Sequence, residues 1–269
     1  MSTALARHWP EYAMEAAELG LFMASAGFFG VLLYHPASPT AHAVADPFLR
    51  RVVMALAMGL TAIALIYSPW GQRSGAHFNP AVTLTFFRLG KVAGWDAVFY
   101  AMAQIGGGLS GILAVAALTG ARVAHPAVSY VATVPGAWGV GVAFAAEVLI
   151  SFGLMAVVLT VSNTARLARF TGLCAGALVA TWIILEAPLS GMSMNPARSF
   201  ASALPANLWT AFWIYLAAPP LGMLLAAELH VRLARLPPPW SSFAHRTGSR
   251  PSRTWSSAAS SMPSGGAAR

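Results

Sequence analysis

The sequence predicts an all-α membrane protein with six transmembrane helices and two re-entrant half-helices, arranged as an inverted repeat. The chain is 57% hydrophobic and only 9% charged, whereas an ordinary soluble domain is roughly 25% charged. Apolar stretches of about 20 residues recur, and each is long enough to cross a hydrocarbon core of ~30 Å. Asn-Pro-Ala occurs twice, at 79–81 and 195–197, in matching places of two similar halves.

The predicted spans divide the chain into two halves of three helices each. An odd number of spans per half inserts the second half upside down relative to the first. The first span is too long for a cleavable signal peptide, and the glutamates in and beside it, Glu11, Glu15 and Glu18, also argue against one. The spans are 12–34, 50–68, 96–118, 138–161, 170–188 and 208–233.

Three segments follow from this division: a first half-repeat at 1–125, a second at 126–235, and a tail at 236–269. Pro237-Pro238-Pro239 ends the last helix. The tail is rich in Ser, Pro, Gly, Ala and Arg and has no helical or strand period, so it is expected to be disordered and cytoplasmic.

The distribution of positive charge predicts the topology. A net charge of +8 suggests nucleic-acid binding at first. Six spans put both termini on one side, however, and that side holds 12 of the 16 Lys and Arg residues. Positive residues mark the cytoplasmic face. Both termini are therefore expected to be cytoplasmic in a cell inner membrane, with the basic excess facing lipid head groups and no nucleic-acid partner.

Each Asn-Pro-Ala is expected to begin a short helix, at 79–89 and at 195–205. Proline fits the first helical turn because its missing N–H would have no partner there. The preceding asparagine caps the helix and presents an amide. These segments are too short to cross, so they enter from opposite faces and meet at the midplane, where only protein or water can cover their ends. The pattern predicts a pore with Asn79 and Asn195 at its midplane and a positive potential that repels cations.

Two glutamates are expected to lie at membrane depth. Glu18 and Glu147 precede Asn79 and Asn195 by 61 and 48 residues. A carboxylate at this depth is costly and needs partners. One interpretation is that each glutamate anchors the backbone of its half-helix loop. The other is a packing carboxylate that is protonated or bonded to a neighbouring helix. Neither interpretation puts the carboxylate in direct contact with a solute.

The stretches 74–83 and 190–199 resemble the two signatures of the aquaporin family of major intrinsic proteins. Gln104 falls where that family keeps a glutamine in its third helix, and Glu18 and Glu147 match its paired glutamates. The resemblance covers about residues 12–233. It implies a right-handed bundle assembled as a homotetramer, with one pore per subunit. It also implies a passive channel for water or small uncharged solutes that excludes protons and ions, in which Asn79 and Asn195 donate hydrogen bonds to the solute.

The resemblance further implies a selectivity filter formed by Met58, Ile183, Met192 and Arg198, with Gly59 as the alternative to Met58. Orthodox water channels have histidine where this chain has Ile183. Glycerol facilitators usually have aspartate where it has Ser199. Methionine is flexible and polarisable, so the opening can adapt to solutes larger than water. A glycerol or neutral metalloid-acid facilitator with low water permeability is therefore the alternative function, and nodulin-like and bacterial metalloid-passing members of the family are the nearest analogy.

The remaining residues leave several interpretations open. His77 is expected to line the cytoplasmic half of the pore or to be a packing histidine. Glu186 is either a solvated or loop-capping carboxylate at a helix end, or a group that pairs with Arg198 or polarises the vestibule. No metal-ligand set, cofactor motif or catalytic residue is found, which argues against an enzyme. A secondary transporter would need a titratable pair at the midplane to couple an ion to a solute, and this sequence places none there. A structural membrane tetramer with a closed pore stays open as an alternative.

Overall fold

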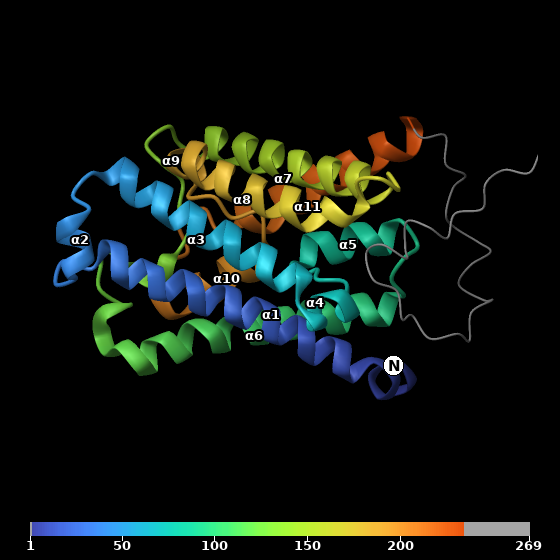
Figure 1. The fold of residues 1–269 in the computed structure, drawn as a ribbon, viewed down its shortest axis with the longest axis horizontal. Coiled ribbons are helices and arrows are strands. Elements are labelled where there is room, and N and C mark those ends of the chain that lie inside the picture. Colours follow the sequence, from blue (N-terminus) through green and yellow to red (C-terminus); the bar gives the residue numbers. More distant parts are fainter. Residues whose placement is uncertain (1, 234–269) are drawn as a thin grey trace, which may run out of the picture.

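The computed structural model describes residues 2–233, and in that range it contains helices and no strand. Six helices are long and apolar enough to cross a membrane, as predicted. The long helices run side by side along the longest axis of the bundle (Figure 1). They are α1 (Ser2–Tyr34), α3 (Pro47–Tyr67), α6 (Gly94–Thr119), α7 (Val140–Ser162), α8 (Thr171–Leu185) and α11 (Trp213–Leu233).

The boundaries differ from the predicted spans in three places. Helix α1 begins at Ser2, well before residue 12. Helix α8 ends at Leu185 because a separate turn, α9 (Ala187–Ser190), leads into the second Asn-Pro-Ala loop. Helix α11 begins at Trp213, not at 208, after a left-handed Asn207 has ended the second half-helix. The predicted tail at 236–269 lies outside the described residues.

Short elements connect the long helices. The two half-helices are α5 (Pro80–Arg88) and α10 (Pro196–Ala206), one residue from their predicted starts. Two further short helices are α2 (Pro39–Ala43) and α4 (Pro69–Ser74). Single 3₁₀ turns are η1 (Gly120–Arg122), η2 (Ser129–Val131) and η3 (Ala168–Phe170).

The helix contacts repeat between the halves. Helix α1 packs along α6, and in the second half α7 packs along α11, while α3 and α8 pack against each other across the two halves. Backbone-to-backbone approach at glycines allows this packing. A Cβ atom on Gly111 would lie 2.0 Å from the Gly20 carbonyl oxygen, and one on Gly222 would lie 2.3 Å from that of Val148. The repeated pairing is that of an inverted repeat.

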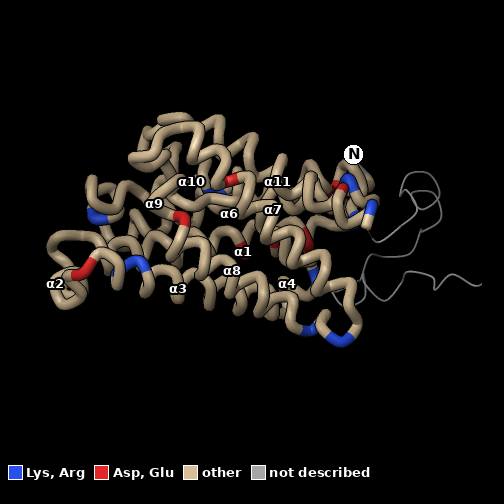
Figure 2. The backbone as a smooth tube through the Cα atoms, turned by 90° about the horizontal axis from the view of Figure 1, so that it is seen from above, with Lys and Arg blue, Asp and Glu red and all other residues tan. Residues whose placement is uncertain are grey.

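The half-helices lie inside this frame. Both α5 and α10 contact α6 and α11, and they contact each other. Most Lys and Arg residues lie toward the two ends of the bundle (Figure 2). The middle of the bundle is therefore mostly apolar, and two short helix ends are buried in it.

Candidate pore and its supporting network

The two Asn-Pro-Ala segments form capped helix starts. The side-chain oxygen of Asn79 accepts a hydrogen bond from Ala81 N at 2.9 Å, and that of Asn195 accepts from Ala197 N at 3.0 Å and from Arg198 N at 3.2 Å. Both asparagines have extended backbones and both helices begin with proline. The motif therefore caps the start of each half-helix through local bonds.

The same asparagines also bind the opposite loop. Asn79 Nδ2 donates to Met194 O at 2.7 Å, and Asn195 Nδ2 donates to Phe78 O at 2.7 Å. This reciprocal pair holds the two half-helix N-termini face to face. A side-chain amide has two N–H donors, so each asparagine keeps one for another acceptor.

The loops that precede the caps have matching, unusual backbones. Ala76 and Phe78 have φ of 50° and 28°, and their counterparts Met192 and Met194 both have φ of 54°. Residues other than glycine seldom adopt this left-handed region. Such a conformation persists where the surrounding structure over-determines it. The pair of loops is therefore held by contacts with the helices around them.

Carboxylates supply those contacts, and the two halves differ in the number of glutamates that they use. In the second half a single residue, Glu147, accepts from Ser193 N at 2.6 Å, from Met194 N at 2.8 Å and from Ser190 Oγ at 2.7 Å. Its side chain is fully buried in α7. Its carboxylate therefore accepts from loop N–H groups that are not paired within a helix.

In the first half this work is divided between two glutamates. Glu15 accepts from His77 N at 2.9 Å and from Phe78 N at 2.6 Å. Among the described residues, Glu18 accepts only from Ser74 Oγ, at 2.9 Å. Glu18 thus supports the loop through the Ser74 hydroxyl, which accepts from Ala76 N at 3.0 Å. One of the two interpretations expected Glu18 to anchor the loop backbone directly, and among the described contacts it does not. Glu15 does so, because the loop lies against the turn of α1 nearer its N-terminus. Two glutamates three residues apart on one helix face were the sequence signal for it.

Gln104 completes the first-half network from α6. Its Nε2 atom lies 2.7 Å from Glu15 Oε2 and 3.1 Å from Thr83 Oγ1. The predicted glutamine therefore contacts the carboxylate that supports the loop, and it lies fully buried behind the pore wall.

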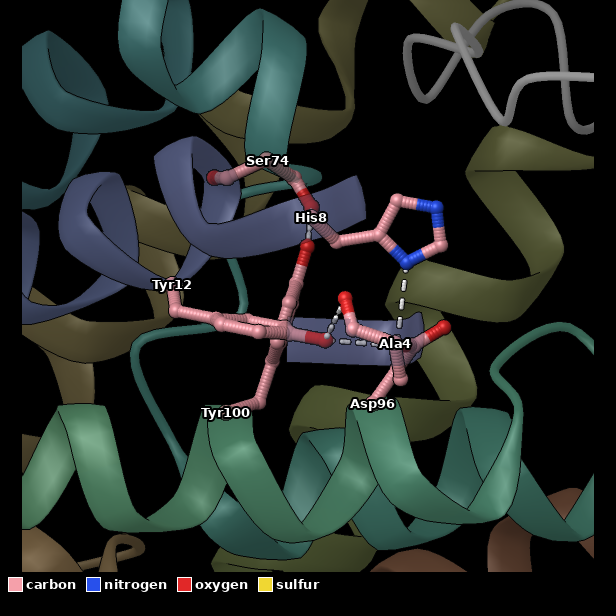
Figure 3. Close-up of polar contacts among 6 residues, drawn as sticks. All are labelled: Ala4, His8, Tyr12, Ser74, Asp96 and Tyr100. Atoms are coloured by element: carbon pink, nitrogen blue, oxygen red, sulfur yellow. Dashed lines mark hydrogen bonds and ion pairs between the residues drawn. The ribbon is translucent and has the colours of Figure 1, made fainter. Parts of the chain in front are cut away.

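A tyrosine in each half reaches the start of its loop. Tyr100 Oη donates to Ser74 O at 2.7 Å (Figure 3), and Tyr215 Oη donates to Ser190 O at 2.5 Å. Figure 3 also shows the polar cluster beside Tyr100, in which Asp96 lies 2.7 Å from Tyr12 Oη and 3.0 Å from His8 Nδ1. These contacts tie α1 to α6 at the end where the first loop enters.

A cavity of about 370 Å³ passes both asparagines. All four residues of the expected filter line it, as does His77. Helices α3 and α8 contribute wall residues at helical spacing. These residues are Arg51, Met54, Met58, Ala62, Ile66, Thr171, Ala175, Val179 and Ile183.

The structure distinguishes Met58 from Gly59. Met58 lines the cavity. Gly59 faces α8, where a Cβ atom would lie 2.7 Å from the Gly176 carbonyl oxygen. Of these two positions, that of Met58 therefore contributes to the cavity.

Arg198 lies on the first turn of α10, beside Asn195. Its Nη1 atom is buried and has no hydrogen-bond partner among the described residues. A guanidinium carries five donors and no acceptor. Arg198 therefore has at least one unpaired N–H donor among the described residues, near the expected filter.

His77 both lines the cavity and packs. Its Nδ1 atom lies 3.1 Å from Thr83 Oγ1, and its ring stacks on Phe86 with centroids 5.0 Å apart. Glu186 is neither solvated nor paired with Arg198 in the described structure, because its side chain is 4% exposed and forms no ion pair there. It stands at the N-cap of α9, where its backbone oxygen accepts from Leu189 N at 2.7 Å.

Comparison with known proteins agrees with this geometry. Residues 16–230 match the family model described as Major intrinsic protein. Aquaporin NIP6-1 of Arabidopsis thaliana is 39% identical over 185 residues, which are 68% of this chain and 58% of that protein. Aquaporin NIP1-3 of Oryza sativa subsp. japonica is 36% identical over 63% of this chain and 57% of that protein. The chain thus spans less than two thirds of these relatives.

A solved structure shows the same fold. The X-ray structure of the aquaglyceroporin from Plasmodium falciparum superposes with a TM-score of 0.71 and 20% sequence identity, over 84% of this chain and 97% of the other. At that identity the likeness concerns the fold. With six apolar helices and this family match, the chain is a multi-pass membrane protein.

Proposed function

Because this chain belongs to the major intrinsic protein family, we propose that it is a passive transmembrane channel for water and small uncharged solutes, and that it excludes protons and ions. One observation carries the proposal. A single cavity passes between two half-helix N-termini that reciprocal bonds from Asn79 and Asn195 hold face to face.

The same groups exclude ions and let neutral solutes pass. Each helix N-terminus carries the equivalent of roughly +0.5 elementary charge, and two of them meet at the midplane, with the Arg198 guanidinium on the first turn of α10. A cation meets this potential after losing its water. A neutral molecule accepts one N–H from each asparagine and moves on.

The composition of the narrow point favours solutes larger than water. Met58, Ile183 and Met192 are apolar, and Arg198 alone carries polar donors there. Each hydrogen bond that water loses at such a point costs about 1–3 kcal/mol. A polyol or a neutral oxyacid keeps apolar contact with three sides while one hydroxyl meets Arg198. Facilitation of such solutes with modest water flux is our preferred form of the function.

The orientation and assembly belong to the same proposal. We place both termini on the cytoplasmic side of a cell inner membrane, because most Lys and Arg residues flank that side. Half-repeats at 1–125 and 126–235 then insert with opposite orientation. Large apolar side chains such as Leu118, at 86% exposed, and Leu149, at 67%, cover the outside of the bundle. We assign this surface to lipid and to neighbouring copies in a homotetramer.

Stopped-flow light scattering on proteoliposomes tests the channel. Water, glycerol and boric acid are applied in parallel, with protein-free liposomes as the baseline. We expect flux of at least one neutral solute above that baseline and proton leak equal to it. Flux at the baseline for all three, from protein that elutes as a folded oligomer, would replace the channel with a structural tetramer.

A double substitution tests the filter separately from the channel activity itself. Ile183→His combined with Met58→Phe narrows the opening and adds a polar partner, so the ratio of water to glycerol permeability should rise. Val179→His is the matched control, because it adds the same side chain one turn away on the same cavity-lining face of α8. An equal rise in the control would show that these four residues do not form the filter.

A further inference from the structure

A second arginine lines the cavity, away from the filter. Arg51, Met54 and Met58 follow one face of α3 and all contribute to the cavity wall. Seven residues separate Arg51 from Met58, which places it about 10 Å nearer the start of α3 at 1.5 Å per residue. We call this end of the cavity, with Tyr34, Arg51 and the segment 127–132, the outer vestibule.

Arg51 contributes to the cavity wall, and its guanidinium has no hydrogen-bond acceptor among the described residues. Its Nε atom is buried, so the two Nη groups are the donors that a ligand can reach, and no described carboxylate forms an ion pair with the side chain. The guanidinium makes a cation–π contact with the ring of Phe48, with 5.4 Å between the guanidinium carbon and the ring centroid. Phe48 orients the guanidinium without using its N–H donors.

The neighbouring arginine shows the contrast. Arg50 Nε donates to Val44 O at 2.6 Å, and its Nη2 donates to Ala41 O at 2.7 Å. It holds the loop around α2 in place. Of two adjacent arginines, one therefore has a structural partner set and the other faces the cavity with unused donors.

The opposite wall of the vestibule has a fixed shape. Ser129, Tyr130 and Val131 have φ of 45°, 50° and 52°, a left-handed turn that is unfavourable for residues other than glycine. Tyr130 N donates to Val123 O at 2.8 Å. The hydroxyls of Thr133 and Ser199 lie 2.7 Å apart and join the segment to α10. Strain of this kind is found where a structure holds a site in one conformation.

We propose that Arg51 forms a second solute-binding position, in the outer vestibule, for small neutral molecules that carry two oxygens on adjacent carbons. A guanidinium presents parallel N–H donors in a rigid fork that suits two nearby acceptor oxygens. Val128 and Val131 offer apolar contact to the carbon side of such a molecule. The inference rests on the proposed channel function and adds a preference that the filter alone does not have.

Two isomers of propanediol test the preference. 1,2-Propanediol and 1,3-propanediol have the same atoms, but only the first has adjacent hydroxyls. Their permeability ratio is measured in proteoliposomes after subtraction of protein-free liposomes. We expect Arg51→Met to lower the ratio of 1,2- to 1,3-propanediol by about two- to tenfold, the range of one net hydrogen bond. Water flux serves as the internal standard.

Two further variants separate the fork from the charge. Arg51→Lys keeps a positive charge without the fork, so the ratio should stay lowered. Arg122→Met removes an exposed charge that is not part of the cavity wall, so the ratio should equal that of the native protein.

The outcomes are distinct. An unchanged ratio in Arg51→Met, with native water flux, overturns the vestibule site and leaves the channel proposal intact. An equal fall in Arg122→Met would assign the effect to surface charge and also overturn the site. Absence of any flux in the native protein would overturn the channel and this inference with it.

Discussion

The two half-helix loops have the same backbone and different supports. Residues 74–81 and 190–197 share the asparagine cap, the left-handed positions and the tyrosine bond to the leading serine. One carboxylate, Glu147, holds the second loop, whereas Glu15 and Glu18 divide that role for the first. The comparison teaches that the inverted repeat preserves backbone geometry and lets the side chains behind it diverge.

The side chains that face the cavity diverge as well. The first loop presents His77, which contacts Thr83 and stacks on Phe86. The second is followed by Arg198, and its Ser193 hydroxyl lies 2.6 Å from that of Ser199. An imidazole beside one half-helix start and a guanidinium beside the other make the two sides of the midplane chemically unequal. We therefore expect barriers to ions to depend more on the second loop.

The largest expected effect is on thermal stability, and it distinguishes the second loop, which one glutamate holds, from the first loop, which two glutamates hold. Glu147→Ala leaves two buried backbone N–H groups without an acceptor, at a cost on the order of 2–6 kcal/mol. Glu15→Ala removes a similar number of bonds, but Glu18 lies one turn away with an unpartnered oxygen. Thermal unfolding in detergent should therefore show a larger loss of stability for Glu147→Ala. Glu147→Gln keeps one acceptor oxygen and should fall between that variant and the native protein.

If Glu15→Ala and Glu147→Ala unfold at the same temperature, Glu18 does not substitute for its neighbour. The two supports would then be equivalent in energy although they differ in geometry.

The next effect concerns the two unequal sides of the midplane. Arg198→Val removes a fixed charge from the wall, and a unit charge at 4 Å is worth about 4 kcal/mol at an effective dielectric constant of 20. Proton or sodium leak in proteoliposomes should rise at least about tenfold, since ~1.4 kcal/mol is a factor of ten. Neutral-solute flux should stay equal or rise.

The matched change on the other side is His77→Val, for which we expect ion leak to stay at the native level. Equal leak from both variants would contradict the inequality of the two loops. Leak from neither would assign ion exclusion to the half-helix N-termini alone.

The smallest expected effect is that of Glu18→Gln. Glu18 accepts a single hydrogen bond, from Ser74, and its Oε2 atom is buried without a partner. An amide keeps an acceptor oxygen for that serine and removes a carboxylate from an apolar site. Stability should therefore change by less than ~1 kcal/mol. A loss as large as that of Glu15→Ala would show that the single bond from Ser74 to Glu18 supports the loop as strongly as the backbone bonds to Glu15 do.

Local features of this chain were readable from its sequence. Composition and span length determine the six membrane helices, because a bilayer admits few other structures for such a chain. Asn79-Pro80 and Asn195-Pro196 determine two helix starts, because capping acts within a few residues. Both features appear in the structure with boundaries shifted by only a few residues in most helices.

Contacts between distant segments were decided by the tertiary structure alone. The reciprocal bonds of Asn79 and Asn195 join loops more than a hundred residues apart. The choice of Glu15 over Glu18 depends on the rotation and depth of α1 against the first loop. The difference between Arg50 and Arg51 depends on which side of α3 faces the cavity. Periodicity places such residues on a helix face, but only the packing of one helix on another determines what that face meets.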